Sequence, residues 1–298
     1  PNRILHRDKQ QEMVTQSLIP IYQKSIPSNL LVYGKPGTGK TLVIKKVLNQ
    51  IQNRLDKNSY PIKLAYTNAK HESTLYGLLL SLGRQLGLQE KKTDNDKLWL
   101  PGTGLAISEV FNRILYIIEK RKINTVFVID EIDYLAELVS KTGKDILYSI
   151  TRANERLQNG SLSLIGISND LTFKERLDPR VISSLSEEEI VFPNYVTNEI
   201  TGILKDRINI AFENDVVSSG ALNLCASMAC GEHGDARRAI DLLRVAAEIA
   251  ERNQTKPITD EHVRMAAQKI EENKEVVALK SYPLHEKLLI ITIMKSPN

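Results

Sequence analysis

One loop restricts the possible folds of this chain more than any other stretch of its sequence. Residues 34–41 read Gly-Lys-Pro-Gly-Thr-Gly-Lys-Thr and match the pattern G-x-x-x-x-G-K-[ST] at every fixed position. The loop follows a short apolar run, residues 30–33, and precedes a segment predicted to be helical from Thr41 to Arg54. A buried strand, a glycine-rich turn and a helix in this order are typical of a phosphate-binding loop in a parallel α/β sheet.

Each residue type in this loop has a physical role in binding a nucleoside triphosphate. Glycines let backbone N–H groups surround the phosphates, and the following helix presents its positive N-terminus. We expect Lys40 to reach the β- and γ-phosphates and the Thr41 hydroxyl to be a ligand of Mg²⁺. The alternative is a flexible glycine turn. The loop therefore predicts that ATP or ADP binds with Mg²⁺ against Pro36, Gly37, Thr38, Gly39, Lys40 and Thr41.

A second apolar run ends in two carboxylates. Residues 126–129 are Val-Phe-Val-Ile, and Asp130 and Glu131 follow directly. A buried strand leaves Asp130 at the C-terminal edge of the sheet, where doubly wound sheets bind their ligands. We expect Asp130 to hold Mg²⁺ through water and Glu131 to orient the water that attacks the phosphate. The alternative is an acidic pair that merely opens the next loop.

The order of predicted elements indicates an α/β domain followed by an all-helical one. Predicted strands alternate with helices, which implies a parallel sheet covered on both faces. The strands are expected at 30–33, 62–66, 126–129, 163–168 and 189–192, with helices at 8–24, 41–54, 73–86, 107–120 and 146–157. After Pro193 only helices are expected, at 197–213, 217–230, 235–252, 259–272 and 284–294. We therefore predict an ATPase domain over 1–193, a helical lid domain over 194–275 and a further segment over 276–298.

Composition excludes several classes of protein. The apolar fraction of 42% and the charged fraction of 26% are ordinary for a globular chain. The net charge of +4 favours an anionic partner only weakly, because nucleic-acid binding depends on where the charge lies. Two cysteines, Cys225 and Cys230, are too few for a disulfide framework or a four-cysteine zinc site. No apolar run reaches the ~18 residues of a membrane span, so we expect a cytoplasmic protein without a membrane partner.

Four stretches together resemble AAA+ ATPases. They are the loop at 34–41, the acidic sequence Asp-Glu-Ile-Asp at 130–133, the strand at 164–170 and the sequence Gly-Asp-Ala-Arg at 234–237. In the resemblance, the strand at 164–170 corresponds to the sensor-one strand, with Asn169 as the polar residue that aligns the attacking water. Arg237 corresponds to the sensor-two arginine, at a helix start in the lid. The implied fold is a doubly wound P-loop sheet with a small all-helical lid.

More specifically, the chain is similar to archaeal replication initiators related to the large subunit of the eukaryotic origin recognition complex. The stretches that carry this similarity are residues 5–8, 177–184, 190–195, 204–207 and 234–244. Asp8 departs from the pattern, because relatives more often carry glutamate there. Phe-Pro-Asn-Tyr at 192–195 and the double serine at 183–184 also favour this family. The resemblance implies a C-terminal winged-helix domain, of which only the first helix, from Leu284 onward, is expected here.

The resemblance assigns further residues to the nucleotide. Leu5 and Arg7 would lie near the adenine, Tyr195 and Arg207 would contact the nucleotide from the domain junction, and Arg237 would reach the phosphates. Arg180 would be an arginine finger that serves the ATP of a neighbouring subunit, for which a guanidinium is suited by its fixed charge and bidentate geometry. The alternatives are a surface residue for Arg207, a helix-start arginine for Arg237 and a loop arginine for Arg180.

The resemblance also implies an initiator-specific insertion that binds DNA. The matching segment is 89–104, where Lys91, Lys92, Lys97 and the single tryptophan, Trp99, cluster between two predicted helices. Basic and aromatic side chains on a loop can grip phosphates and a groove. The alternative is a polar loop that Trp99 anchors to the core.

The function implied by these features is an ATP-dependent replication initiator. It would bind double-stranded origin DNA in the nucleoid, assemble with other initiator subunits and help to load the replicative MCM helicase. ATP would act mainly as a conformational switch that closes the lid, and hydrolysis would be slow if the arginine finger must arrive from another subunit. Two alternatives share the nucleotide motifs: a STAND-type signalling ATPase that does not bind DNA, and a clamp-loader subunit.

Overall fold

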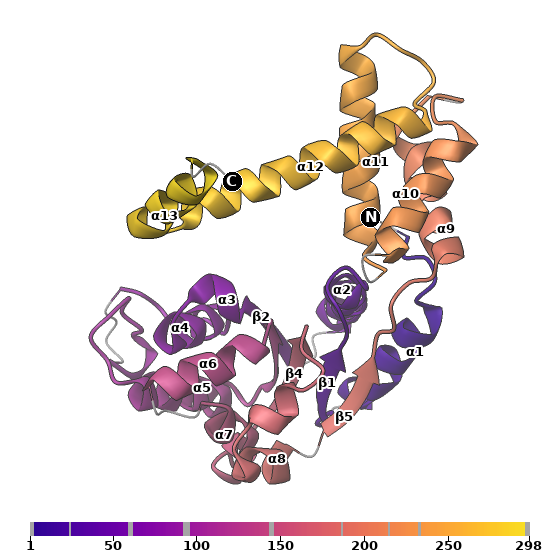
Figure 1. Ribbon diagram of the computed structural model, residues 1–298. Coiled ribbons are helices and arrows are strands. Elements are labelled where there is room, and N and C mark those ends of the chain that lie inside the picture. Colours follow the sequence, from indigo (N-terminus) through magenta and orange to yellow (C-terminus); the bar gives the residue numbers. More distant parts are fainter. Residues whose placement is uncertain are drawn as a thin grey trace. The chain divides into compact units, whose positions relative to one another are not determined.

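The computed structural model describes residues 3–23, 25–58, 62–91, 96–142, 146–185, 187–213, 215–231 and 234–295. The chain forms two compact units, Pro1–Asn194 and Tyr195–Asn298 (Figure 1). The first unit has two clusters of buried apolar side chains and the second has one of its own. Each unit therefore has the core that an independently folded domain needs.

The first unit is built on a parallel β-sheet, as the alternation of strands and helices predicts. Its strands are β1 (Asn29–Tyr33), β2 (Ile62–Asn68), β3 (Asn124–Asp130), β4 (Ser161–Ser168) and β5 (Glu187–Val191). They lie in the order β2-β3-β4-β1-β5, and every neighbouring pair is parallel. The doubly wound fold class is confirmed. The strands extend beyond their apolar runs because buried Thr67, Thr125 and Ser161 continue the ladder.

Helices cover both faces of the sheet. The helices of this unit are α1 (Asp8–Ser17), α2 (Lys40–Asn58), α3 (Ala69–Glu72), α4 (Leu75–Gln85), α5 (Ile107–Arg121), α6 (Asp133–Thr142), α7 (Ile146–Thr151) and α8 (Pro179–Leu185). Successive residues of a strand point to opposite faces. In β3, accordingly, Phe127 and Ile129 pack in one cluster, whereas Val126 and Val128 pack in the other.

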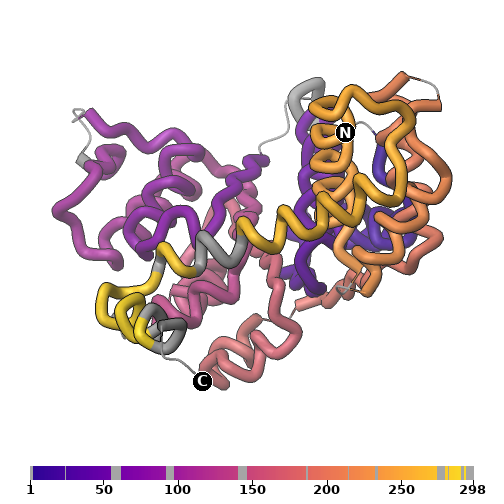
Figure 2. Tube along the Cα trace, turned by 45° about the horizontal axis from the view of Figure 1, so that its top comes forward, coloured from indigo at the N-terminus to yellow at the C-terminus, as the bar shows by residue number. Residues whose placement is uncertain are grey.

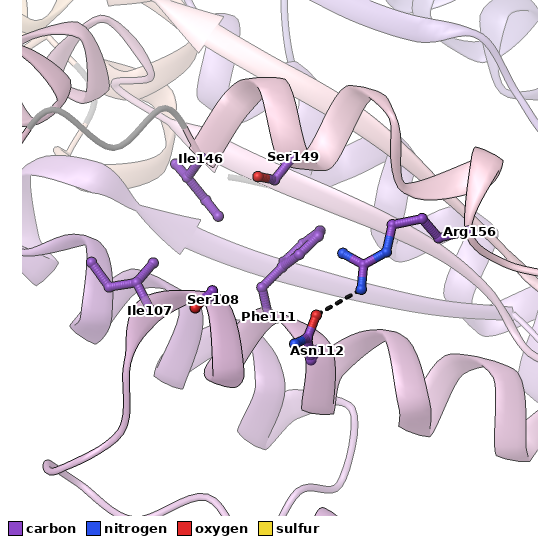
Figure 3. Close-up of a pocket in the computed structure, with 7 residues that line it drawn as sticks. All are labelled: Ile107, Ser108, Phe111, Asn112, Ile146, Ser149 and Arg156. Carbon is purple, nitrogen blue, oxygen red and sulfur yellow. Dashed lines mark hydrogen bonds between the residues drawn. The ribbon is translucent and has the colours of Figure 1, made fainter.

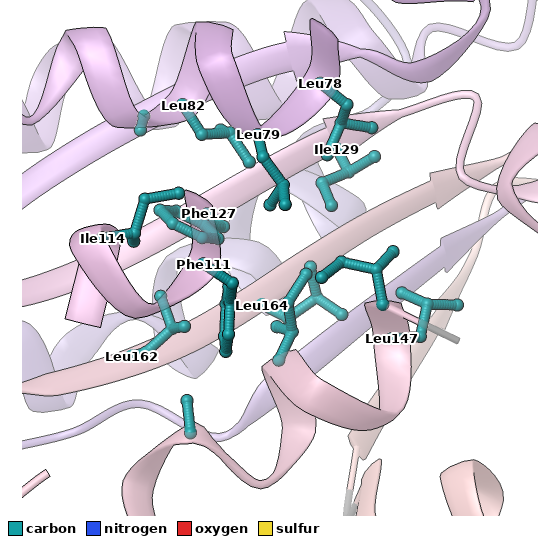
Figure 4. Packing of buried hydrophobic residues seen from close by; sticks show 14 of the residues in the cluster. Leu78, Leu79, Leu82, Phe111, Ile114, Phe127, Ile129, Leu147, Leu162 and Leu164 are labelled. Carbon is teal, nitrogen blue, oxygen red and sulfur yellow. The ribbon is translucent and has the colours of Figure 1, made fainter. Parts of the chain in front are cut away.

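The two faces are filled by different helices. Side chains of α4, α5 and α7 meet the strands in the first cluster, in which Figure 4 labels Leu78, Leu79, Leu82, Phe111, Ile114, Phe127, Ile129, Leu147, Leu162 and Leu164. On the opposite face, residues of α1 and α2 such as Val14 and Val43 join Val128. The phosphate-binding loop lies between β1 and α2, so its position is fixed by the second cluster.

Several predicted element bounds are wrong. The helix expected at 8–24 ends at Ser17 and is followed by a 3-10 turn at Ile19–Gln23, where Pro20 cannot donate a backbone hydrogen bond. The helix expected at 146–157 ends at Thr151. Helices α3, α6 and α8 were not expected, since each is short and lacks a long periodic pattern. Arg180 lies in the first turn of α8, not in a loop, and follows Pro179 at the first helical position.

The second unit is entirely helical among its described residues. It contains α9 (Thr197–Ala211), α10 (Ser219–Gly231), α11 (Ala236–Arg252), α12 (Asp260–Ser281) and α13 (Leu284–Lys295). Helix α12 packs on the core through Val263 and Ala266, then continues well beyond the predicted end at residue 272 (Figure 2). It stops where Tyr282, which precedes Pro283, takes an extended conformation. The assignment of α13 to a winged-helix domain stays a prediction.

None of the helices in the described part of the chain is long and apolar enough to span a membrane.

Candidate nucleotide-binding site

The phosphate-binding loop joins the end of β1 to the start of α2. Gly34 has a φ of +154°, and a Cβ atom there would lie 2.5 Å from the carbonyl oxygen of Phe192. Gly39 has a φ of +92°, a backbone conformation that residues with a side chain rarely adopt. These two glycines are therefore required by close backbone approach and by backbone conformation, respectively. The loop ends in Lys40 and Thr41, the first residues of α2.

The ammonium group of Lys40 is buried within this loop. The side chain is only 5% exposed. Its Nζ donates hydrogen bonds to the carbonyl oxygens of Gly34 (2.7 Å) and Lys35 (2.9 Å), and to Oδ1 of Asn169 (2.8 Å). The structure thus brings together the lysine of the loop and the predicted sensor-one residue. These three oxygen atoms are hydrogen-bond partners of the buried charge.

Thr41 and Asp130, the two residues predicted to hold the metal, are in direct contact. Thr41 Oγ1 donates a hydrogen bond to Asp130 Oδ2 at 2.9 Å, and the backbone N–H of Glu131 donates to Asp130 Oδ1 at 3.0 Å. Asp130 is only 7% exposed. A hydroxyl and a carboxylate at this distance offer the oxygen ligands that Mg²⁺ prefers.

The chemistry of the donor set fits Mg²⁺ bound together with phosphates. Among the described residues, no group of three or more His, Cys, Asp and Glu side chains could hold a metal on its own. Mg²⁺ is commonly held by one or two carboxylates plus the phosphates of a substrate. Thr41 and Asp130 are suited to that arrangement and not to an all-protein metal cage.

Tyr66, at the end of β2, also contacts Asp130 and was missed by sequence reasoning. Its hydroxyl donates a hydrogen bond to Asp130 Oδ2 at 2.8 Å. Burial and, next, this hydrogen bond raise the pKa of the Tyr66 phenol above its ordinary value. The contact depends on the parallel register of β2 and β3, in which Asn68 lies opposite Asp130. No local pattern in the sequence specifies that register.

Glu131 occupies the left-handed region of backbone conformation. Its φ is +52°, which costs an amino acid with a side chain about 1–3 kcal/mol. The turn is held on both sides, because Glu131 N–H bonds to Asp130 Oδ1 and the N–H of Ile132 bonds to the carbonyl of Ile167 at 3.0 Å. Such strain is concentrated at functional sites and is consistent with a catalytic position.

Asp133 links the acidic turn to the sensor-one strand. Its Oδ1 accepts hydrogen bonds from Ser168 Oγ at 3.0 Å and from the backbone N–H of Asn169 at 3.2 Å. The Asn169 side chain is therefore presented to Lys40 from a backbone that Asp133 fixes. Asp133 was noted within the acidic motif but was not assigned to the site, because the motif alone does not show what its second aspartate contacts.

Arg7 holds the loop from the N-terminal segment. The side chain is 3% exposed, and its Nε donates to the carbonyl of Thr38 at 2.9 Å while its Nη2 donates to the carbonyl of Pro193 at 2.6 Å. Arg7 is thus hydrogen-bonded to the backbone at Thr38 and at Pro193, and its guanidinium also lies 5.9 Å from the centre of the Phe192 ring. Leu5 is partly buried. Contact of either residue with an adenine stays a prediction.

Arg180 belongs to a different environment. Its side chain is 73% exposed and forms a bidentate pair with Asp178, with Nε–Oδ1 and Nη2–Oδ2 distances of 3.0 and 2.8 Å. Its guanidinium also lies 5.4 Å from the centre of the Tyr148 ring. The Arg180 side chain, followed by its backbone N–H, lowers the pKa of Asp178 to about 2. These described contacts do not include the phosphate-binding loop.

Three predicted nucleotide contacts lie in the second unit. Tyr195 is buried, at 5% exposure. Arg207 is partly exposed on α9, and Arg237 is exposed in the first turn of α11. Asp235 caps that helix by accepting hydrogen bonds from the backbone N–H groups of Arg237 and Arg238. The contacts of Tyr195, Arg207 and Arg237 with a nucleotide stay predictions.

The predicted DNA-binding segment is partly tied to the ATPase core. Trp99 Nε1 donates to the carbonyl of Glu90 at 2.8 Å, and the Arg113 guanidinium of α5 lies 5.7 Å from the Trp99 ring. Lys97 Nζ lies 5.1 Å from the Tyr116 ring. Lys91 is exposed, and Lys92 lies outside the described residues. Trp99 therefore contacts α5 through Arg113, and its contact with DNA stays a prediction.

A separate cavity of about 290 Å³ lies between α5 and α7 (Figure 3). It is lined by Ile107, Ser108, Phe111, Asn112, Ile146, Ser149 and Arg156. Arg156 Nη2 donates to Asn112 Oδ1 at 2.7 Å on one side of it. None of these residues is a predicted site residue.

Comparison with known proteins identifies the family of this chain. Residues 24–173 match the model of an AAA domain, and residues 201–268 match that of a Cdc6 AAA+ ATPase-type lid domain. The chain is 65% identical over 296 residues to the ORC1-type DNA replication protein of Cenarchaeum symbiosum, covering 99% of this chain and 70% of that protein. Identity to the ORC1-type DNA replication protein of Thermococcus onnurineus is 42% over 294 residues, covering 99% and 69%.

The structure agrees with the sequence comparison. The fold is similar to that of the Aeropyrum pernix ORC1 protein in complex with DNA, with a TM-score of 0.85 and 38% identity, over 99% of this chain and 73% of that one. The predicted resemblance is confirmed, and the initiator is favoured over a signalling ATPase or a clamp-loader subunit. The chain belongs to the archaeal ORC1-type DNA replication proteins, the Orc1/Cdc6 family of AAA+ initiators.

Proposed function

We propose that this initiator binds ATP with Mg²⁺ at the cluster around Lys40 and uses the nucleotide as a conformational switch. The observation that carries the proposal is the buried Lys40 ammonium, held between two carbonyl oxygens of the phosphate-binding loop and Oδ1 of Asn169. A buried cation needs compensating partners, and this one has them at the position where phosphate oxygens would bind. Thr41 and Asp130 provide metal ligands beside it.

In this proposal the residues of the cluster divide the work of hydrolysis. Lys40 and the loop backbone bind the phosphates, while Thr41 and Asp130 hold Mg²⁺, which neutralises phosphate charge when bound. Glu131 orients the attacking water, and Asn169 aligns it against the terminal phosphate. The left-handed conformation of Glu131 ends β3 directly after Asp130, so that the two carboxylates stand at the end of the strand.

The lid and a neighbouring subunit complete the site. Tyr195, Arg207 and Arg237 of the second unit contact the nucleotide, so that ATP and ADP favour different lid orientations. Arg180 of an adjacent subunit supplies the arginine finger. Support comes from its 73% exposure and from the Asp178 and Tyr148 contacts, which keep its guanidinium at the surface. Hydrolysis by a single chain is then slow, because this charge must arrive in trans.

The biological role proposed for the switch is origin binding and helicase loading. The similarity to Aeropyrum pernix ORC1, whose structure was determined in complex with DNA, supports double-stranded DNA as a partner. Other initiator subunits and the replicative MCM helicase complete the assembly, which places the protein on the nucleoid. Lys91, Lys92, Lys97 and Trp99 contribute phosphate and groove contacts from the segment at 89–104.

Nucleotide binding and DNA binding are tested on the same preparation. A fluorescent ATP analogue is titrated with Mg²⁺, and the affinity for labelled origin duplex is then measured in ATP and in ADP across a salt series. The proposal predicts Mg²⁺-dependent nucleotide binding and a nucleotide-dependent DNA affinity. Identical DNA binding with ATP, ADP and no nucleotide would rule out the switch.

The lysine segment is tested with a charge-matched control. Replacing Lys91, Lys92 and Lys97 by glutamate should weaken DNA binding and reduce the salt slope, because fewer counterions are released. Replacing the exposed Lys9, Lys63 and Lys122 by glutamate changes the net charge equally outside the segment. If both triple variants bind duplex DNA alike, the segment at 89–104 has no DNA-binding role of its own.

A further inference from the structure

The Asp130 carboxylate accepts hydrogen bonds from three donors. Two hydroxyl groups, Thr41 Oγ1 and Tyr66 Oη, donate to Oδ2 at 2.9 and 2.8 Å, and the backbone N–H of Glu131 donates to Oδ1 at 3.0 Å. An ionised carboxylate offers about four lone-pair positions, two on each oxygen. The described contacts fill both positions on Oδ2 and leave one position on Oδ1.

The two hydroxyl donors converge on Asp130 because both lie on the side of the sheet that α1 and α2 cover. Val126, Val128 and Asp130 alternate along β3, and the two valines belong to the cluster that α1 and α2 cover. Tyr66 packs against the same cluster from β2, and Thr41 lies in the first turn of α2. The loop lysine and the acidic strand are standard parts of such a site, whereas the β2 hydroxyl is an additional contact.

Tyr66 is itself held from two directions. The side-chain amide of Gln85 in α4 accepts from the Tyr66 N–H at 2.9 Å and donates to the Tyr66 carbonyl at 2.8 Å. Because β2 is an edge strand, these are the backbone groups that no further strand can pair. On the ring side, Lys45 Nζ lies 4.2 Å from the centre of the Tyr66 ring. Both contacts restrict where the hydroxyl can point.

We propose that Tyr66 is a positioning residue of the metal site, which fixes the Asp130 carboxylate so that Oδ1 alone is open to a water ligand of Mg²⁺. The inference rests on the proposed Mg²⁺-ATP binding and adds to it how the metal carboxylate is oriented. With Oδ2 occupied by two hydroxyl donors, the carboxylate cannot rotate to bind the ion with both oxygens. Outer-sphere donors of this kind commonly contribute about 10–100-fold to metal affinity.

The test is the substitution Tyr66→Phe, which removes one hydroxyl and keeps the ring. The Mg²⁺ concentration that half-saturates binding of a fluorescent ATP analogue should rise by about tenfold. Binding of the analogue in EDTA should stay at the wild-type level, since the loop and Lys40 are unchanged. Mn²⁺ bound in the ternary complex, measured by electron paramagnetic resonance, should show the same loss of affinity. These readouts do not depend on hydrolysis.

Tyr33 provides the matched control. It lies at the end of β1 in the same sheet, and its buried hydroxyl has no hydrogen-bond partner among the described residues. Tyr33→Phe should leave the Mg²⁺ dependence unchanged. Gln85→Glu, which can accept from the Tyr66 N–H but cannot donate to its carbonyl, should give a smaller rise than Tyr66→Phe.

The outcomes separate this inference from the proposed function. If wild-type protein binds the analogue without any dependence on Mg²⁺, the metal site is wrong and Tyr66 has no such role. If the wild type depends on Mg²⁺ and Tyr66→Phe has the same half-saturating concentration, only the role of Tyr66 is overturned. An equal rise in Tyr33→Phe would also overturn it, because the effect would then be a general loss of sheet stability.

Discussion

Lys40 and Arg180, two cations of the ATPase unit that are both predicted to act on a triphosphate, differ in burial and in the partners that surround them. We call these surroundings the buried cluster (Lys40) and the exposed cluster (Arg180). Lys40 is buried, and its described partners are oxygen atoms of the loop and of Asn169, where we propose that a phosphate binds. Arg180 is 73% exposed, and its partner is a local carboxylate, Asp178. A buried cluster is organised by the fold that contains it, whereas an exposed one must exchange its local partner for a ligand brought by another molecule.

The largest expected effect is on turnover in the buried cluster. Glu131→Gln keeps the side-chain size and removes the charge that polarises water, so turnover should fall by about a hundredfold while ATP still binds. Phosphate release under single-turnover conditions measures the first quantity and equilibrium titration the second. Wild-type turnover in this variant would remove Glu131 from the chemistry.

The next largest effect is expected on nucleotide affinity, which should depend on Lys40 and not on Arg180. Lys40→Ala removes a buried charge-assisted contact and should lower the affinity for Mg²⁺-ATP by at least about tenfold. Arg180→Ala is the matched control, because it removes a cation that lies outside the loop and should leave the affinity of dilute protein unchanged. Equal losses in both variants would contradict the distinction between the clusters.

A smaller effect is expected from Arg180 on turnover at high protein concentration. Arg180→Ala should abolish any rise of turnover per chain with concentration, because only paired chains receive a finger. Mixing Arg180→Ala with Glu131→Gln should restore activity, since the former supplies an intact Glu131 and the latter an intact Arg180. A mixture no more active than the sum of its parts would argue that Arg180 does not act in trans.

The smallest effect is expected on the pKa of Asp178. Asp178 has a pKa of about 2, below the ordinary value of 3.8, so its pair with Arg180 stabilises the fold above about pH 3.8 and is lost as the pH falls towards 2. Arg180→Ala removes the first cause of this shift and keeps the backbone N–H, so the pKa should rise only part of the way to 3.8. Carboxyl chemical shifts measured by NMR across an acid titration would detect it, and an unchanged value would show that Arg180 is not paired in solution.

The sequence predicted the parts of the site that are local. Lys40 and Thr41 follow from one loop, and Asp130 from an apolar run that ends in acid, because each position is set by neighbours along the chain. Tyr66 could not be found in this way, since its contact with Asp130 depends on the register between β2 and β3. Its only signal is that a tyrosine ends the strand predicted at 62–66.

The fold shows the same division. Strands and long helices were found from hydrophobic periodicity, which is strongest over long segments. Helices α6 and α8 were missed because each is short, and α8 begins at a proline that also suits a loop. The extension of α12 to Ser281 was missed because the exposed polar residues Glu271, Glu272 and Asn273 interrupt the periodic apolar pattern.

Arg7 connects the phosphate-binding loop to the last residues of the first unit. One guanidinium joins the carbonyl of Thr38, inside the loop, to that of Pro193, at the end of the first unit. Phe192 N–H bonds to the carbonyl of Tyr33 at 2.7 Å, just before the loop begins. The backbone of the phosphate-binding loop is therefore joined to Pro193 by a single side chain, in addition to the hydrogen bonds of the sheet.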